Sequence, residues 1–177
     1  MYKRQIKNAT LVDGLGGAPK AGDLAIKDGV IAEIGAISGQ AKETINAEGA
    51  YAAPGWVDVH THYDGQVSWD DVMDPSFSHG VTSVVMGNCG VGFAPCPPGG
   101  EQRMIELMEG VEDIPGTALY EGIEWGRWET FPEYIEYLGT REYTLDIGTQ
   151  VPHSAVRNYV MGERALRHED ATAEDLS

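Results

Sequence analysis

A change of pattern at Pro54-Gly55 is the sequence feature that most restricts the fold. Before it, short apolar runs alternate with turn signals, and after it strand-like runs alternate with helix-like ones. Strands that alternate with helices are typical of βα units built on a parallel sheet. We therefore predict an α/β protein with two parts, a small β segment at residues 1–53 and three βα units at residues 54–177.

The first part is predicted to contain strands at residues 5–12, 23–26 and 30–34. The last two flank Lys27-Asp28-Gly29, and Asp-Gly between apolar runs is a strong hairpin signal. The glycine-rich run at residues 14–17 has no helical pattern after it, so it predicts a loop and not a phosphate-binding turn.

The second part is predicted to contain strands at residues 56–61, 81–86 and 143–151, with helices between and after them at 75–79, 101–109, 130–138 and 154–161. The helix at 130–138 is predicted to open with a capping box, Thr130 to Glu133, and to bury Phe131, Tyr134, Ile135 and Leu138. A helix start at Thr172 is followed by only a few residues. A closed β/α barrel needs eight such units and about 250 residues. The chain is therefore expected to be truncated, as a fragment, as one half of a split protein or as the product of an incomplete gene.

The charge excludes some partners. The chain has 12 Lys and Arg against 28 Asp and Glu, a formal charge of −16, whereas a surface that binds nucleic acid or an anionic membrane needs clustered cations. No apolar run approaches the roughly 18 residues of a membrane span, and the N-terminus has no signal-peptide core. A soluble, cytoplasmic protein is expected.

His60 and His62 are the strongest candidates for chemistry. Side chains alternate across a strand, so the two imidazoles are predicted to share one face and to converge on one divalent ion. A His-x-His pair also arises by chance in roughly one such chain in seven, so the pair alone is weak. Its context, a Pro-Gly pair followed by a short apolar strand, strengthens the metal interpretation.

Cys89 follows the second predicted strand directly and has glycine neighbours in Gly87-Asn-Cys-Gly90. Its thiolate is predicted to bind or bridge metal on the same face as the histidines. The competing interpretation is a buried, inert cysteine, which is the more common case in general. That interpretation is preferred for Cys96, and two cysteines make a poor disulfide framework.

Four further residues are candidates for binding substrate: Asp64, Asn88, His153 and Arg157. His153 follows the third strand, but local packing at a helix start explains it equally well. Arg157 has the geometry to hold a carboxylate through paired hydrogen bonds, although a surface salt bridge is the preferred interpretation. His79 and His168 are interpreted as structural or solvent-exposed.

The sequence from Pro54 to His62 resembles the metal-dependent amidohydrolase superfamily. The stretch Gly80–Gly90 narrows the resemblance to the N-acyl-D-amino-acid deacylase (D-aminoacylase) branch, and the stretches 112–116, 128–134 and 151–157 match that branch as well. The resemblance implies the N-terminal part of a TIM-like (β/α) barrel preceded by a small β-sandwich segment.

The resemblance also implies a site. Its first-strand histidines match His60 and His62, its cysteine ligand matches Cys89, and the cofactor is Zn2+, as one or two divalent ions. Many superfamily members bridge two metals with a carboxylated lysine, but no lysine follows Lys42, which leaves Cys89 for that place. Two more histidine ligands and the general-base aspartate are expected beyond residue 177, so the catalytic residue is unknown.

The implied function is metal-dependent hydrolysis of small-molecule N-acyl (D-)amino acids by activated water, with the isolated chain inactive. One alternative is another amidohydrolase reaction, cyclic amide hydrolysis or deamination. A second is a non-enzymatic metal-binding fragment, or a subunit that needs a second chain.

Overall fold

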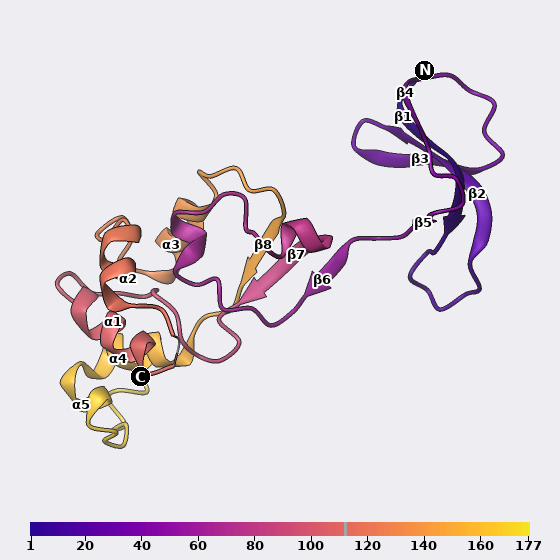
Figure 1. The fold of residues 1–177 in the computed structure, drawn as a ribbon. Coiled ribbons are helices and arrows are strands. Elements are labelled where there is room, and N and C mark those ends of the chain that lie inside the picture. Colours follow the sequence, from indigo (N-terminus) through magenta and orange to yellow (C-terminus); the bar gives the residue numbers. More distant parts are fainter. Residues whose placement is uncertain (112) are drawn as a thin grey trace. The chain divides into compact units, whose positions relative to one another are not determined.

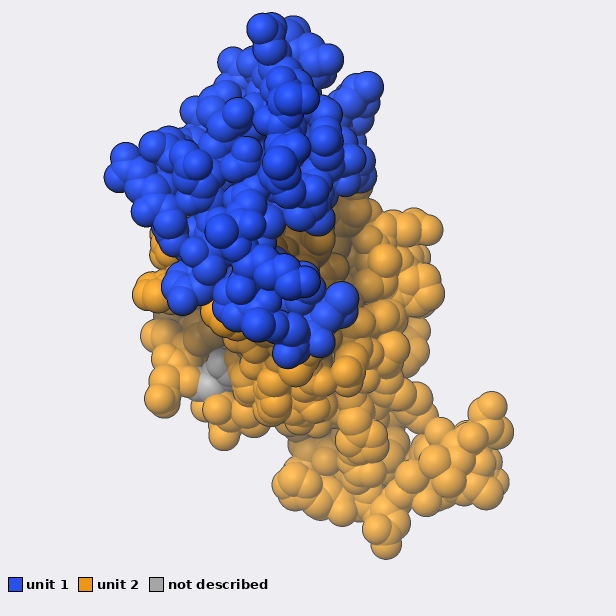
Figure 2. Space-filling model, turned by 90° about the vertical axis from the view of Figure 1, so that its right-hand side faces the viewer, with its two compact units in different colours: residues 1–55 blue, residues 56–177 orange. Residues whose placement is uncertain are grey.

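The computed structural model describes residues 1–111 and 113–177 (Figure 1). Glu112, where one of the family-like stretches begins, lies outside the described residues. The chain forms two compact units, Met1–Gly55 and Trp56–Ser177, which Figure 2 colours blue and orange. Across the described residues, no helix has both the length and the apolar character needed to cross a membrane.

The first unit is one five-stranded sheet in the order β3-β2-β1-β4, with β5 also pairing with β1. β1 pairs antiparallel with β2 and parallel with β4 and β5, while β2 and β3 form an antiparallel pair. The strands are β1 (Tyr2–Leu11), β2 (Lys20–Lys27), β3 (Val30–Gly35), β4 (Ala41–Asn46) and β5 (Tyr51–Ala52).

The predicted hairpin is confirmed, because Lys27 pairs with Val30 across a two-residue turn. Asp28 and Gly29 have φ values of 52° and 81°, which is the left-handed pair that a type I′ turn requires. β4 and β5 were not predicted from the sequence. β4 has the pattern Ala-Lys-Glu-Thr-Ile-Asn, in which polar residues outnumber the apolar ones that mark a strand.

The second unit is built on three parallel strands in the order β6-β7-β8, which lie side by side in Figure 1. The strands are β6 (Trp56–Asp58), β7 (Val81–Met86) and β8 (Asp146–Thr149). Two short 3-10 turns follow β6, η1 (Gln66–Ser68) and η2 (Phe77–His79). The helices are α1 (Glu101–Glu109), α2 (Gly116–Gly122), α3 (Phe131–Leu138), α4 (His153–Met161) and α5 (Glu163–Leu166).

The alternation of strands and helices is confirmed, but several boundaries were wrong. The strands predicted at 56–61 and 143–151 are shorter, at Trp56–Asp58 and Asp146–Thr149. The helix predicted at 75–79 is only the 3-10 turn η2, which Gly80 ends with a φ of 86°. One turn closes too few hydrogen bonds to stabilise an α-helix. α2 and α5 were missed because both are short and lack a clear apolar period.

The core of the second unit lies between the sheet and helices α1 and α3. Fully buried side chains include Val84 and Met86 on β7, Phe93 after it, and Met104 on α1. α3 begins at the predicted capping box, in which Thr130 accepts from the Glu133 amide. Its buried face was predicted in part wrongly: Ile135 is 43% exposed, and the stripe that packs is Tyr134, Tyr137 and Leu138, spaced i, i+3, i+4.

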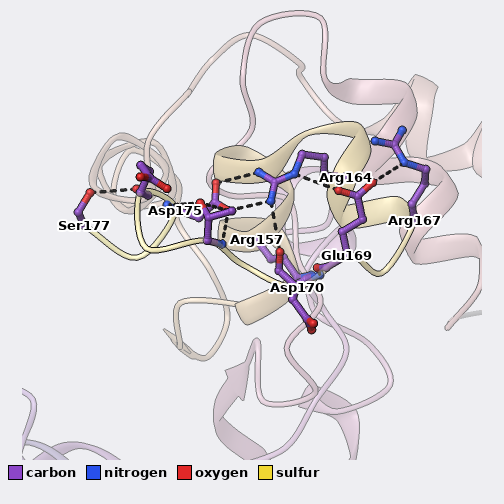
Figure 3. Close-up of polar contacts among 9 residues, drawn as sticks. Arg157, Arg164, Arg167, Glu169, Asp170, Asp175 and Ser177 are labelled. Atoms are coloured by element: carbon purple, nitrogen blue, oxygen red, sulfur yellow. Dashed lines mark hydrogen bonds and ion pairs between the residues drawn. The ribbon is translucent and has the colours of Figure 1, made fainter.

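Arginine side chains tie the C-terminal segment together (Figure 3). Arg164 forms ion pairs with Glu169 at 3.1 Å and with Asp175 at 3.0 Å, and it also donates to the carbonyl of Asp170. Asp175 in turn accepts from the backbone amide of Thr172 at 2.7 Å. Thr172 therefore begins a single turn and no helix.

Asp175 is predicted to lose these contacts only in strong acid. Arg164, with the Thr172 amide, lowers the pKa of Asp175 from its usual value to about 2. Because the pKa in the folded chain lies below that in the unfolded chain, the stabilisation is complete above about pH 4. It is lost as the pH falls from about 4 toward about 2.

An NMR titration of the Asp175 carboxyl group checks this expectation. Arg164→Gln is expected to move its midpoint up toward the unperturbed value of about 3.9. Arg167→Gln is the matched control, since Arg167 pairs with Glu169 and not with Asp175. A midpoint that stays low in Arg164→Gln contradicts the assigned cause.

Candidate metal centre

Three metal-ligating side chains meet where β6 and β7 end. His60 and His62 lie in the segment after β6, and Cys89 lies in the turn after β7. Parallel neighbouring strands bring their carboxyl ends to the same edge of the sheet. One ligand atom from each residue lies within 4.8 Å of the other two. His60 and Cys89 are exposed and His62 is half-buried, so solvent reaches the group.

The contacts within this group are short. Cys89 Sγ lies 2.7 Å from His60 Nε2 and 3.1 Å from His62 Nε2. The two imidazole rings stack with their planes 9° apart. An ion bound at about 2.3 Å from sulfur and about 2.0–2.1 Å from nitrogen, at the tetrahedral angle, separates those atoms by about 3.6 Å. Both contacts would therefore lengthen by less than about 1 Å around zinc.

The donor set fits zinc. Two imidazole nitrogens and one thiolate sulfur are the ligands that Zn2+ prefers, and three protein ligands leave a fourth position for water or substrate. No other group of His, Cys, Asp or Glu within residues 1–111 and 113–177 meets the same ligand spacing. The predicted trio is thus brought together, although His60 and His62 lie after the strand and not within it.

Hydrogen bonds to backbone groups hold the His60–His62 segment in place beside β7. Thr61 donates its amide and its hydroxyl to the carbonyl of Val85, at 2.9 and 3.0 Å. Asn88 donates its side-chain amide to the carbonyl of Val59. The Asp58 carboxylate accepts from the amide of His60 at 3.1 Å. The predicted substrate residue Asn88 therefore supports the backbone beside His60.

Glycines shape the turn that carries Cys89. Gly87 and Gly90 have φ values of 83° and 79°, and the Gly90 amide closes the turn on the Gly87 carbonyl at 3.0 Å. A Cβ on Gly87 would collide with the carbonyl oxygen of Gln150. Only glycine combines this left-handed conformation with such a close approach of backbone.

Asp64, two residues after His62, is buried. Asp64 is 6% exposed, and its carboxylate accepts hydrogen bonds from the backbone amides of Asp64 itself and of Gly87. Burial raises the pKa of Asp64 to about 7 in spite of those hydrogen bonds. The carboxylate thus links the segment after β6 to the turn after β7.

The remaining candidates lie at different distances from the group. His153 is exposed at the start of α4 and lies beside Gly90, next to Cys89 in sequence. The Arg157 guanidinium donates to the carbonyl of Glu169 in the C-terminal segment (Figure 3). Cys96 is buried, and burial together with Glu101 raises the pKa of its thiol to about 11. His79 is exposed and bonds the Pro75 carbonyl.

Comparison with known proteins identifies the family of the chain. Residues 43–176 match the sequence profile of the amidohydrolase family, and that stretch covers most of the chain. The chain belongs to the amidohydrolase family. The resemblance inferred from the sequence is thereby confirmed at the level of the family.

Individual relatives indicate to which branch of the family this amidohydrolase chain belongs. D-aminoacylase of Alcaligenes xylosoxydans xylosoxydans is 32% identical over 171 residues, which cover 95% of this chain and 33% of that protein. A structure describing a binuclear metal centre in D-aminoacylase superposes with a TM-score of 0.78 at 28% identity, covering 99% of this chain and 34% of that one.

The N-acyl-D-glutamate deacylase of Bordetella bronchiseptica, solved with zinc and a phosphonate inhibitor, superposes with a TM-score of 0.71 at 28% identity, covering 98% of this chain and 34% of that one. The D-aminoacylase branch is thus confirmed. The amidohydrolase chain spans 26–33% of the length of the curated relatives that it matches along more than nine-tenths of its own length.

Proposed function

We propose that this chain carries the first part of the metal centre of an enzyme that hydrolyses N-acyl-D-amino acids. The observation that carries the proposal is the convergence of His60, His62 and Cys89 to within 4.8 Å. The relatives support it, because a D-aminoacylase with a binuclear centre and a deacylase with bound zinc share this fold. The cofactor is accordingly Zn2+, as one or two ions.

A bound divalent ion supplies Lewis-acid polarisation of the acyl carbonyl and activates water as the nucleophile. The chain's own residues provide the cradle. His60 and His62 offer Nε2 atoms and Cys89 offers Sγ, on two segments that Asn88 and Thr61 hold together. His60 and Cys89 are exposed to solvent, which would give a substrate amide access to the trio.

Four side chains are proposed to assist substrate binding, and the structure supports them unequally. His153 is exposed beside Gly90 and suits the role best, while Asn88 lies next to Cys89 but uses its side-chain amide to bond the carbonyl of Val59. The Asp64 carboxylate is buried, so its contribution would be to hold the site's backbone. Arg157 would have to leave the carbonyl of Glu169 to reach a substrate.

The fold proposal goes with the function. We infer that residues 54–177 form the first βα units of a TIM-like barrel and that residues 1–53 form part of a β-sandwich. Support comes from the parallel order β6-β7-β8 and from superposition on about a third of D-aminoacylase. The remaining strands, two histidine ligands and a general-base aspartate would belong to a longer protein or to a second chain.

The test compares substrates and preparations. A longer protein containing this chain is expected to release free amino acid from N-acetyl-D-amino acids in the presence of Zn2+, and not from the L enantiomers or from cyclic amides. The 177-residue chain alone is expected to bind Zn2+ and release none. Preferred hydrolysis of a cyclic amide would favour the alternative amidohydrolase reaction. Strong metal-dependent release by the chain alone would contradict the inferred division of the site.

A further inference from the structure

Three tyrosine hydroxyls converge on the segment that follows His62. Tyr134 donates to the carbonyl of Asp64 at 3.3 Å, Tyr137 to that of Ser68 at 3.3 Å, and Tyr143 to that of Val67 at 2.9 Å. Two come from α3 and the third from the segment before β8. All three acceptors lie within residues 64–68, which include the turn η1.

Burial makes these hydrogen bonds costly to break. Tyr134 is 3% exposed and Tyr137 is 7% exposed, and Val67 and Ser68 are themselves buried. A hydroxyl moved from water into an apolar core without a partner costs free energy, so the buried phenols of Tyr134 and Tyr137 need their carbonyls, and the half-buried Tyr143 needs its carbonyl less. Burial raises the pKa of Tyr134 well above its usual value and that of Tyr143 to about 12, so both remain protonated donors.

The anchored segment leads directly to the metal ligands. Asp64 is two residues from His62, and on the other side Thr61 is bonded to Val85 of β7. The backbone on one side of His62 is therefore bonded to β7 through Thr61, and the backbone on the other side is bonded to Tyr134 through Asp64. Loss of either set of hydrogen bonds would loosen the backbone that orients the imidazole of His62.

Further hydrogen bonds join the segment between α3 and β8 to the loop after β6. Arg141 donates to the Asp71 carboxylate at 3.0 and 2.5 Å, and Thr144 donates its amide to the Asp71 carbonyl at 3.0 Å. Thr144 also donates its hydroxyl to the carbonyl of Val72 at 2.5 Å. The segment from α3 to β8 thus bonds the loop after β6 at positions from Asp64 to Val72.

We propose that Tyr134, Tyr137 and Tyr143 are positioning residues for the metal centre, acting through the segment 64–68. Phenylalanine rings would fill the same space in the core. The hydroxyls add the bonds to this segment, and the hydroxyl of Tyr143 also bonds Arg141. The inference rests on the proposed metal site. Removal of a hydroxyl leaves the ligands in place but loosens the backbone that orients them, as happens when the outer partner of a metal ligand is lost.

The experiment measures affinity for Co2+, used as a spectroscopic substitute for Zn2+, in single Tyr→Phe variants of the purified protein. Tyr134→Phe is expected to weaken Co2+ binding about 10-fold and to alter the cobalt absorption spectrum. Tyr143→Phe and Tyr137→Phe, whose bonds lie further from His62, are expected to have smaller effects in the same direction. Tyr159→Phe is the matched control, because its hydroxyl bonds Glu129 at 2.8 Å, away from the segment.

Two readouts separate positioning from general stability. Amide exchange of Val67 and Ser68 in the metal-free protein is expected to speed up in the three variants and not in the control. If all three variants melt lower but keep the wild-type Co2+ affinity, spectrum and local exchange rates, the positioning role is wrong. If the wild-type protein binds no Co2+, the proposed metal site fails, while faster exchange at Val67 still shows that the hydroxyls hold the segment.

Discussion

Replacing His60 with alanine is expected to weaken binding of Zn2+ or Co2+ by more than about 100-fold. Loss of an outer partner of a metal ligand typically costs 10- to 100-fold, and loss of a ligand itself costs more. Isothermal titration of the purified protein measures the change. His79→Ala is the matched control, because His79 is exposed, its imidazole bonds the carbonyl of Pro75, and it lies outside the ligand group.

Substitution of the two cysteines tests the same ligand group by spectroscopy. The Co2+ complex is expected to show a thiolate charge-transfer band that Cys89→Ser abolishes. Cys96→Ser is expected to keep the band, since Cys96 is buried with a thiol pKa of about 11. Equal loss of affinity in His60→Ala and His79→Ala, or a band that survives Cys89→Ser, would contradict the assigned ligands.

Gly87→Ala is expected to disrupt both the fold and the site. Gly87 has a φ of 83°, and a Cβ there would collide with the backbone oxygen of Gln150. The left-handed conformation alone costs a residue with a side chain about 1–2 kcal/mol. The collision adds to that cost, because the carbonyl belongs to backbone and not to a flexible side chain. The turn that carries Cys89 must therefore shift, so metal affinity should fall as well.

Gly126→Ala separates strain from collision. Gly126 has a φ of 80°, but a Cβ there would meet nothing within 4 Å. We expect this control to lose only the about 1–2 kcal/mol of the strained conformation and to bind metal normally. Thermal melts and Co2+ titrations of the two variants give the comparison. If Gly87→Ala matches Gly126→Ala in both measurements, the close approach of the turn to β8 has no consequence.

The sequence predicted the elements whose local signals agree with the fold. The Asp28-Gly29 turn, the Thr130 capping box and the apolar strand at 81–86 each carry their own physical cause in neighbouring residues. The grouping of His60, His62 and Cys89 was also predicted, because each of them follows a strand at the same edge of the sheet.

What the sequence did not reveal depends on contacts between distant segments. The hydroxyls of Tyr134 and Tyr137 bond carbonyls about 70 residues earlier in the chain. No local pattern reports such a pairing, although a buried tyrosine always raises the question of its partner. The burial of Asp64 has the same origin, since it depends on the turn at Gly87 and on the segments packed around it.

The most direct test of the central claim is anomalous diffraction at the zinc absorption edge from crystals grown with Zn2+. A peak is predicted at bonding distance, about 2.0–2.3 Å, from His60 Nε2, His62 Nε2 and Cys89 Sγ. Crystals that bind zinc only elsewhere, with no peak among these three atoms, would contradict the assignment of the metal centre.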